Sequence, residues 1–251
     1  MSDAPELRPT LIRPDWPAPA SVGAFVTTRE TGPSQGDFAG FNSASHVGDN
    51  PEHVALCRRL LRKEVGDERP LLWLDQVHGA SVQQEWSDAA PQADASMATS
   101  TDYGCVVLTA DCLPVFFCDK SGERVAVAHA GWRSLAGGVL EATVAAMGVA
   151  PESLLAWLGP AISNAQFEVG PEVREAFCGV HPEAASAFDP SPYRLGHHMG
   201  DLYKLARLRL ERLGLSHISG GHFCTVCESR FYSFRRDDGV TGRMASVIWL
   251  R

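Results

Sequence analysis

Three side chains able to bind a metal ion or to act in acid–base and nucleophilic chemistry follow apolar runs of the sequence. His78 follows LLWLDQV, Cys112 follows CVVLTAD, and His129 follows VAVA. In α/β architectures, strand ends present reactive side chains to a shared cleft. Because each of the three also lies next to a Gly, Pro or Asp residue, we expect them to converge on one site.

A His–Cys–His set is compatible with three kinds of chemistry. Imidazole and thiolate are good zinc ligands, and three protein ligands with an open position are typical of catalytic zinc. Such an ion lowers the pKa of a bound water to about 7. Alternatively, Cys112 is a nucleophile with His129 as its base. Two His and one Cys also match a mononuclear copper site, so the spacing leaves all three readings open.

Arg133 lies four residues after His129, near the start of the helix expected over 134–148. Helix N-termini and arginine side chains both favour anions, which makes Arg133 a candidate phosphate ligand. The alternative is an arginine that packs over Trp132 or pairs with a carboxylate.

Two further polar residues stand beside the candidate ligands. Gln76 lies two residues before His78, hence on the same face of a strand, and is expected to reach the site. Asp111 precedes Cys112 and is expected either to orient a ligand histidine or to cap a turn.

Other polar clusters are less specific. The pair in CTVC (224–227) has no second such pair in the chain, which argues against a structural zinc ribbon. The segment FRRDDGVTGR (234–243) contains Arg235, Arg236 and Arg243, and fits an anion site or a salt-bridged surface hairpin. The nine histidines include no His-x-His pair, so a multicopper cluster is not expected.

The elements that must position these residues are mixed. Apolar periodicity predicts helices over 51–66, 134–148, 170–180 and 201–214. It predicts strands within 22–29, 70–79, 80–86, 103–131, 153–162, 217–225 and 246–250, and loops over 32–51 and 93–101. Strands and helices both alternate and cluster, which favours an α+β fold in layers. Residues 1–20 are expected to form an irregular lead-in, and residues 21–251 a single domain.

Composition narrows the class of protein. The chain has 251 residues, 45% of them hydrophobic, and a net charge of −8, which disfavours nucleic acid as a partner. No apolar run approaches the ~20 residues needed to cross a bilayer. Seven unevenly spaced cysteines and an acidic, proline-rich N-terminus without a signal pattern indicate a cytoplasmic protein with reduced thiols.

Six motifs in sequence order resemble one known family. They are DQVHG, TADCLPV, AHAGWR, GPAISNAQFEVG, DLYKLARLRL and CTVCESRFYSFRRDDGVTGR. The chain resembles, over about residues 20–251, the multicopper polyphenol oxidase (laccase) domain family, whose members are also called peptidoglycan editing factor and purine nucleoside phosphorylase. The resemblance implies a cysteine-hydrolase-like catalytic domain with four α/β/β/α layers and two mixed sheets. It also implies a zinc site made by His78, Cys112 and His129.

The resemblance extends to substrate contacts. It makes Asn42, His46 and Arg58 candidates for substrate binding. The chain departs from the usual family pattern at Ser45, Cys57 and Gln166, where the family has Leu, Asn and Cys, and these changes affect details of the substrate pocket.

The leading functional hypothesis is a zinc-dependent enzyme that acts on purine nucleosides. It would phosphorolyse adenosine, inosine or methylthioadenosine, or deaminate adenosine, with nucleoside and phosphate as small-molecule partners. The alternative is a hydrolase that cleaves amide bonds in cell-wall (peptidoglycan) precursors with the same Cys/His site. Copper-dependent polyphenol oxidation is a third hypothesis, and a non-enzymatic zinc-stabilised binding module is a fourth.

Overall fold

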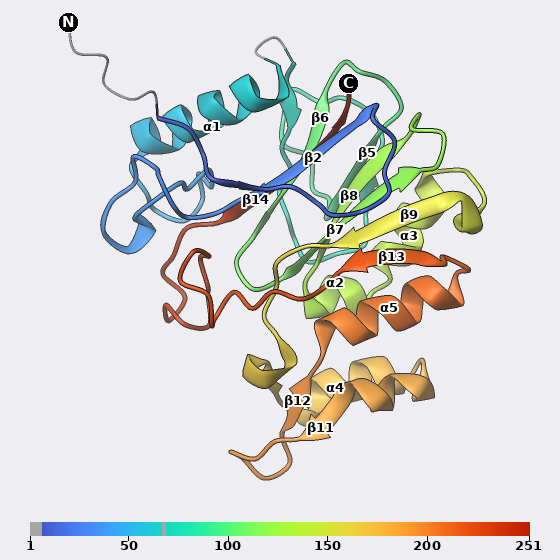
Figure 1. The fold of residues 1–251 in the computed structure, drawn as a ribbon. Coiled ribbons are helices and arrows are strands. Elements are labelled where there is room, and N and C mark those ends of the chain that lie inside the picture. Colours follow the sequence, from blue (N-terminus) through green and yellow to red (C-terminus); the bar gives the residue numbers. More distant parts are fainter. Residues whose placement is uncertain (1–6, 67–68) are drawn as a thin grey trace, which may run out of the picture.

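Two large mixed sheets and one small sheet form the framework of the protein in a computed structural model that describes residues 7–66 and 69–251 (Figure 1). The five-stranded sheet has the order β1 (Leu11–Ile12), β2 (Val22–Thr27), β14 (Met244–Leu250), β6 (Gly104–Thr109) and β3 (Leu71–Leu72). The six-stranded sheet has the order β13 (His217–Gly220), β9 (Leu154–Leu158), β7 (Leu113–Asp119), β8 (Val125–Ala130), β5 (Ala95–Ala98) and β4 (Val82–Gln83). The three-stranded sheet has the order β10 (Glu168–Val169), β12 (His198–Gly200) and β11 (Phe188–Pro190).

Among the described residues, five α-helices accompany the sheets. They are α1 (Pro51–Val65), α2 (Trp132–Ala136), α3 (Val139–Ala146), α4 (Pro171–Cys178) and α5 (Leu202–Arg212). Short 3-10 turns occur at Gly36–Phe38, Pro151–Ser153, Asn164–Gln166 and Pro182–Ala187. None of the helices in the described residues is long and apolar enough to cross a membrane.

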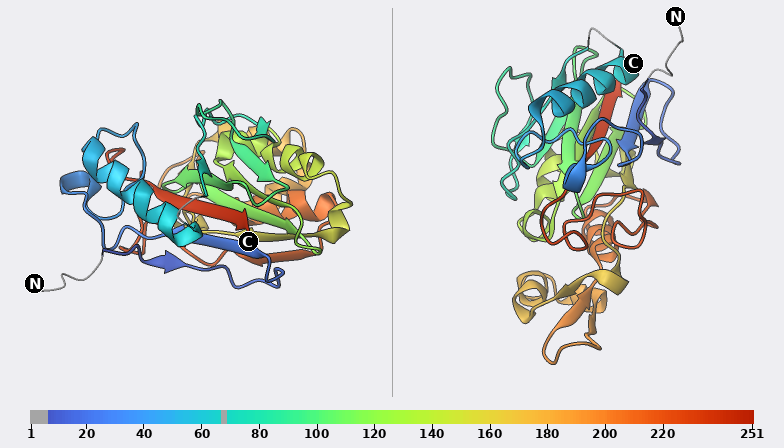
Figure 2. Two further views of the ribbon diagram at one scale, coloured as in Figure 1. Left: turned by 90° about the horizontal axis from the view of Figure 1, so that it is seen from above. Right: turned by 90° about the vertical axis from the view of Figure 1, so that its left-hand side faces the viewer.

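The elements are stacked in four layers, as expected. One apolar cluster joins α1 to the five-stranded sheet, a second lies between the two large sheets, and a third joins the six-stranded sheet to α3 and α5. Seen from above, α1 lies on one side of the strands and the orange and yellow-green helices lie on the other (Figure 2). The α+β class, the single domain and the two mixed sheets are therefore confirmed.

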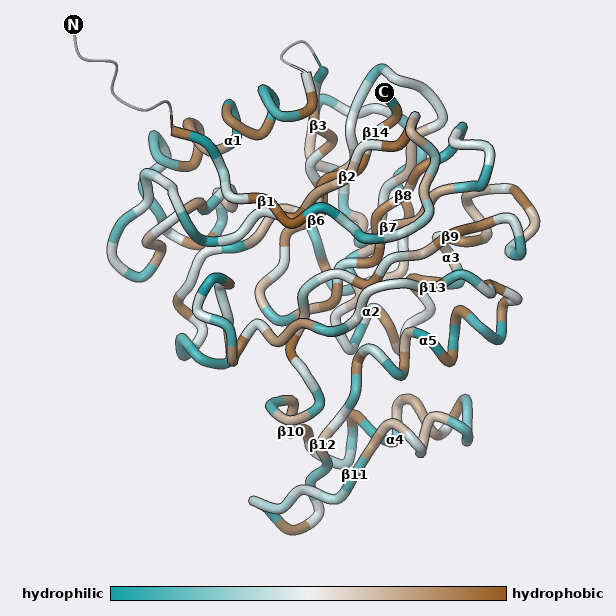
Figure 3. Tube along the Cα trace, viewed as in Figure 1, coloured by the Kyte–Doolittle hydropathy of each residue, from teal (hydrophilic) through white to brown (hydrophobic). Residues whose placement is uncertain are grey.

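The central strands are mostly apolar, and this lets both of their faces be buried. In β7, Val115 and Phe117 pack toward the helices, whereas Phe116 packs between the sheets. There Phe116 stacks on Trp157 of β9 at a ring separation of 5.6 Å. The strands in the middle of the molecule are accordingly brown in Figure 3, whereas brown and teal alternate along α1 and α5.

Local signals define α1 as predicted. The side chain of Asn50 accepts a hydrogen bond from the backbone N–H of Glu52, and Pro51 occupies the first turn. Gly66 ends the helix with φ of 104°, a value that residues with a Cβ rarely adopt. This helix covers the outer face of the five-stranded sheet.

Several predicted elements differ in the structure. The helix predicted over 134–148 is two helices, α2 and α3, because Gly138 adopts φ of 92° between them. The predicted loop at 93–101 contains β5, a central partner of β8. The strand predicted over 70–79 is reduced to β3, and the following strand β4 belongs to the other large sheet. The predicted lead-in contains β1, which pairs with β2.

The small antiparallel sheet was not expected from the sequence. Together with α4 it forms an extension at the lower end of the molecule in both Figure 1 and the right-hand view of Figure 2. His198 lies in β12 of this sheet. Phe177 and Phe188 join the extension to the apolar cluster shared with α5, so it is continuous with the main core.

Candidate metal centre and substrate cavity

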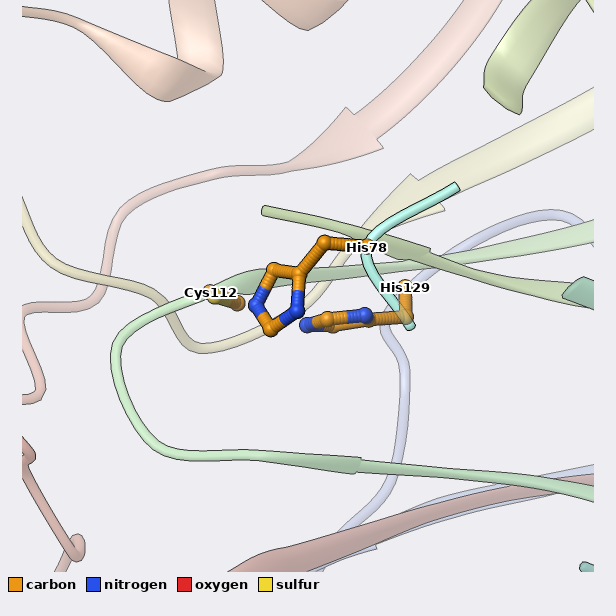
Figure 4. A group of neighbouring side chains, drawn as sticks. All are labelled: His78, Cys112 and His129. Carbon is orange, nitrogen blue, oxygen red and sulfur yellow. The ribbon is translucent and has the colours of Figure 1, made fainter. Parts of the chain in front are cut away.

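The three candidate ligands come together as predicted. His78 lies in the turn after β3, Cys112 directly precedes β7, and His129 lies on β8 (Figure 4). One ligand atom from each residue lies within 4.8 Å of the other two, and the trio could hold a metal ion. The imidazole rings of His78 and His129 meet edge to face with centroids 4.8 Å apart.

Strand register explains how Cys112 reaches His129. In the β7–β8 hairpin Leu113 pairs with Ala130, so the residue before β7 lies at the same end of the sheet as His129. Gly131 follows and leaves room for the cluster. A Cβ at this position would lie 2.9 Å from Cys112 Sγ and 3.1 Å from His78 Cδ2.

Asp94 organises the cluster, and the sequence did not identify it. Its carboxylate accepts hydrogen bonds from the backbone N–H groups of Val77, His78 and Gly79 at 3.2, 3.0 and 2.6 Å. These bonds hold His78 in a left-handed backbone conformation with φ of 60°, which is uncommon for a residue other than glycine.

The same carboxylate fixes the orientation of His129. Asp94 Oδ1 lies 2.7 Å from His129 Nδ1, and the backbone N–H of His129 donates to the Asp94 carbonyl at 2.7 Å. When His129 is neutral and its proton is on Nδ1, the other ring nitrogen, Nε2, has a free electron pair on the side of Cys112 and His78 for a metal ion. The signal that the sequence did offer was weak: one aspartate before an apolar segment that reads as a loop.

The side chains of the cluster favour a charge-separated state even without a metal ion. Burial would raise the pKa of Cys112, but the charge of His129 and hydrogen bonds from His129 and His78 outweigh it and lower the pKa to about 6. Burial would likewise lower the pKa of His129, but the Cys112 thiolate and the hydrogen bond with Asp94 raise it to about 9. The favoured state near neutral pH is therefore a thiolate beside an imidazolium held by a carboxylate.

A cavity of about 430 Å³ opens on the cluster. Its lining combines the three candidate ligands with apolar residues and with cationic residues. The apolar part includes Trp132, Ile162, Phe167 and the half-exposed Phe234. A concave, mostly apolar site with a few convergent polar groups is the usual form of a small-molecule site.

The arginines that line the cavity differ in how far they are already engaged. Arg235 donates to the carbonyls of Gln166 and Glu168, and Arg243 donates to those of Thr241 and Gly242. Arg133 lies over the Trp132 ring at 4.4 Å and makes no hydrogen bond or ion pair to any residue in the described ranges. Its guanidinium donors are therefore available to an anion in the cavity.

Two other candidate substrate contacts also line the cavity. Burial and the charges of Arg243 and Arg58 lower the pKa of His46, so its side chain is neutral near pH 7. Gln76 is already bonded at both ends of its amide, since it donates to the Leu108 carbonyl at 2.9 Å and accepts from the Leu108 N–H at 2.8 Å. It forms part of the wall and ties this turn to β6.

Asn42 and Arg58 are not among the residues that line the cavity. Asn42 is buried, and its amide bonds Asp49 at 2.9 Å, the backbone of Ala44 and the Arg243 N–H. It therefore shapes the 32–51 loop that carries His46.

Arg58 is engaged by the same loop. Its guanidinium stacks over Trp73 at 4.0 Å and donates to the Ser43 carbonyl and to Ser45 Oγ. Ser45, a departure from the family pattern, is thus a partner of Arg58, while Cys57, another departure, is buried among apolar residues.

Asp111 lines the cavity, and its carboxylate bonds Thr225 and Arg235 rather than a ligand histidine. Its carboxylate accepts from Thr225 Oγ1 at 2.5 Å and from the Arg235 N–H at 2.6 Å. Arg236, by contrast, pairs with Asp237 at 2.8 Å and donates to the Thr225 carbonyl, away from the cavity lining.

Comparison with known proteins gives this arrangement a family. Residues 23–251 match the family described as multi-copper polyphenol oxidoreductase laccase. The chain belongs to this laccase family. Among its relatives, "Purine nucleoside phosphorylase PA4543" of Pseudomonas aeruginosa is 52% identical, over 96% of this chain and 98% of that protein. "Purine nucleoside phosphorylase YfiH" of Escherichia coli is 46% identical, over 96% of this chain and 98% of that protein.

Solved structures of the family show the same fold. The Neisseria meningitidis protein NMB0706 superposes with a TM-score of 0.91 at 50% identity, covering 96% of this chain and 98% of that one. YlmD from Geobacillus stearothermophilus has a TM-score of 0.86 at 31% identity, covering 98% and 97% of the two chains. The resemblance inferred from the six motifs is therefore confirmed.

The donor set fits one ion of a metal that accepts nitrogen and sulfur. The set consists of a neutral His129 whose Nδ1–H group donates to Asp94, a second imidazole and an acidic thiol. These ligands suit zinc, and also copper. The laccase family name refers to several copper ions. In the described parts of this chain, His78, Cys112 and His129 form the single group of three or more such ligands.

Proposed function

We propose that this protein is a zinc-dependent purine nucleoside phosphorylase that acts on adenosine, inosine or methylthioadenosine. One observation carries the proposal: a His–Cys–His group and Arg133, whose guanidinium has no hydrogen-bond or ion-pair partner among the described residues, line the same cavity of about 430 Å³. Relatives that share about half of this sequence are named purine nucleoside phosphorylases, which supports the substrate class.

The cavity offers each part of the reactants a suitable surface. Phe167 and Phe234 present flat apolar rings, on which a purine base can stack. Arg133 presents planar N–H donors that match the oxygens of phosphate. A nucleoside placed between them would have its glycosidic bond near the cluster of His78, Cys112 and His129.

The chain's own residues then position the reaction. Arg133 holds phosphate so that one of its oxygens attacks the anomeric carbon of the ribose, while the bond from that carbon to the purine nitrogen breaks. The base leaves with the proton that the hydrogen phosphate gives up, and the sugar is released as ribose 1-phosphate, or as 5-methylthioribose 1-phosphate when the substrate is methylthioadenosine. Holding both reactants in one cavity removes much of the entropic barrier of a two-substrate reaction.

A zinc ion bound by His78, Cys112 and His129 would supply Lewis acidity to a substrate atom in contact with it. Asp94 keeps His129 in the tautomer that leaves Nε2 available to that ion. Copper suits the same three ligands, and metal analysis of protein produced without added metal distinguishes the two ions.

The test uses purified, zinc-loaded protein with each nucleoside in the presence and absence of phosphate. We expect phosphate-dependent formation of the free base and of the sugar 1-phosphate, which is ribose 1-phosphate from adenosine or inosine and 5-methylthioribose 1-phosphate from methylthioadenosine. Inosine formed from adenosine without phosphate would instead indicate deamination, the second purine reaction proposed for this site. If fully zinc-loaded protein releases no base from any of the three nucleosides, phosphorolysis is wrong.

A second candidate function is hydrolysis of an amide bond in a cell-wall precursor. The observation that favours it is the chain of contacts from Asp94 to His129 to Cys112, in which a carboxylate holds an imidazole beside an acidic thiol. This is the arrangement of cysteine-dependent acyl transfer. Cleavage of a muropeptide by metal-free protein would support it. Retained activity with cobalt, together with protection of Cys112 from alkylation by that metal, would exclude a free-thiolate mechanism.

A further inference from the structure

A second pair of cysteines lies in the turn after β13, outside the metal cluster. Cys224 and Cys227 have their sulfur atoms 3.1 Å apart, and both are free thiols. Cys227 is exposed and Cys224 is partly exposed. Two thiols this close on the surface can form a disulfide after a small side-chain rotation.

The two sulfurs have different environments. Cys224 Sγ accepts hydrogen bonds from Ser163 Oγ at 3.1 Å and from the Cys227 backbone N–H at 3.4 Å. When Cys224 is ionised, the Cys227 thiol is a third donor. Burial would raise the pKa of Cys224, but the hydrogen bonds from Ser163 and Cys227 outweigh it and lower the pKa. The hydrogen bond with Cys224 raises the pKa of Cys227, so Cys224 is the better nucleophile.

The turn between the sulfurs is held in place on both sides. The N–H of Thr225 donates to the Ala161 carbonyl at 3.1 Å, and Thr225 Oγ1 donates to Asp111. Arg236 donates to the Thr225 carbonyl at 3.0 Å. These contacts keep the two thiols together in the reduced protein, which favours reaction between them once one is modified.

The surroundings do not complete a metal site. The nearest carboxylate in the turn, Glu228, accepts from the Cys224 N–H and pairs with Arg230 at 2.6 Å. Within the described residues, the pair belongs to no group of three or more metal-ligating side chains. Thiol chemistry therefore accounts for the arrangement better than metal binding.

We propose that Cys224 and Cys227 form a redox site that reacts with small-molecule disulfides and closes reversibly to an intramolecular disulfide. The Cys224 thiolate attacks one sulfur of the small disulfide, and the first small thiolate leaves. Cys227 then loses its proton and attacks Cys224 Sγ, which displaces the second thiolate. Two protein thiols and one disulfide thus become one protein disulfide and two small thiols.

The remaining cysteines help to make the site observable. Cys57, Cys105 and Cys118 are fully buried, and burial raises the pKa of each to about 12. Cys112 is protected when zinc is bound. Cys178 on α4 is partly exposed and provides a matched control.

The test exposes the full-length, zinc-loaded protein to oxidised glutathione and maps each cysteine by mass spectrometry after alkylation. We expect the unaltered protein to release two glutathione molecules, retain none, and lose both free thiols at 224 and 227. Dithiothreitol restores them. C227S retains one glutathione on Cys224, whereas C224S forms an adduct at least about tenfold more slowly. C178S behaves like the unaltered protein.

Three results would overturn the proposal. One is that both thiols remain alkylatable after prolonged exposure to oxidised glutathione. Another is that the unaltered protein accumulates a stable mixed disulfide without closing the ring. The third is that C224S and C227S acquire adducts at equal rates, since the two sulfurs would then be equivalent surface thiols.

Discussion

Replacing Asp94 with Asn tests the structural basis of the metal centre most directly. Asp94 Oδ1 bonds His129 Nδ1 at 2.7 Å and the His78 N–H at 3.0 Å, while Oδ2 accepts from Val77 and Gly79 at 3.2 and 2.6 Å. The carboxylate is an acceptor at all four positions. Asn has the same shape but replaces one acceptor oxygen with an N–H₂ donor.

Either orientation of the Asn amide damages the site. If its oxygen faces His129, the N–H₂ group faces the N–H groups of Val77 and Gly79, and two donors lose their acceptor. If its N–H₂ faces His129, Nδ1 must accept, the proton moves to Nε2, and the ring can no longer bind metal through Nε2. Loss of such an outer partner weakens metal binding by about 10- to 100-fold, or about 1.4–2.7 kcal/mol.

The assay is competition for zinc with a chromophoric chelator, with the thiolate absorbance of the cobalt-substituted protein as a second measure. D119N is the matched control, because Asp119 likewise accepts from the backbone N–H groups of Glu123 and Arg124 but lies in the distant β7–β8 turn. We expect D119N to lower stability without changing metal affinity. Zinc binding by D94N as tight as that of D119N would refute the role given to Asp94.

Three further predictions concern the same cavity. Because the pKa of Cys112 is lowered to about 6, this residue is a thiolate above that pH and loses its charge as the pH falls through it. Its iodoacetamide rate in metal-free protein should therefore be half-maximal near pH 6, and a midpoint near the ordinary value of about 8.5 would contradict this. G131A should lower zinc affinity because the added Cβ would lie 2.9 Å from Cys112 Sγ. In the control G79A the added Cβ would lie 3.6 Å from its nearest neighbour, so zinc affinity should be retained. Equal zinc affinities of the two variants would contradict this prediction. R133Q should raise the KM for phosphate by roughly 10- to 100-fold with zinc content unchanged, and an unaltered KM in the phosphorolysis assay would remove Arg133 from the phosphate site.

The sequence was most informative where a local pattern has one physical solution. Continuous apolar runs such as that of β7 require burial on both faces, and this predicted the central strands. Asn50, Pro51 and Gly66 predicted both ends of α1. The convergence of polar residues at strand ends followed from the same pattern, because reactive side chains that interrupt buried strands collect at sheet edges.

The sequence was least informative where a residue acts through distant partners. Asp94 stands 35 positions from His129 and 16 from His78 in the chain, and its segment of small residues reads as a loop. That segment forms β5 only because β8 offers a partner. Asn42 and Arg58 were expected at the substrate, but their polar groups are engaged by the loop that carries His46.

The amino-acid sequence by itself determined the layered α+β fold, the family and the identity of the three ligands that could hold a metal ion. It did so because the apolar patterns and the motifs each consist of residues that are close together in the sequence. The tertiary structure alone decided which carboxylate orients His129, which arginine of the cavity lining has no hydrogen-bond or ion-pair partner among the described residues, and that Cys224 and Cys227 stand apart from the cluster. Those properties depend on hydrogen bonds and distances between segments far apart in sequence, which exist only once the sheets have packed.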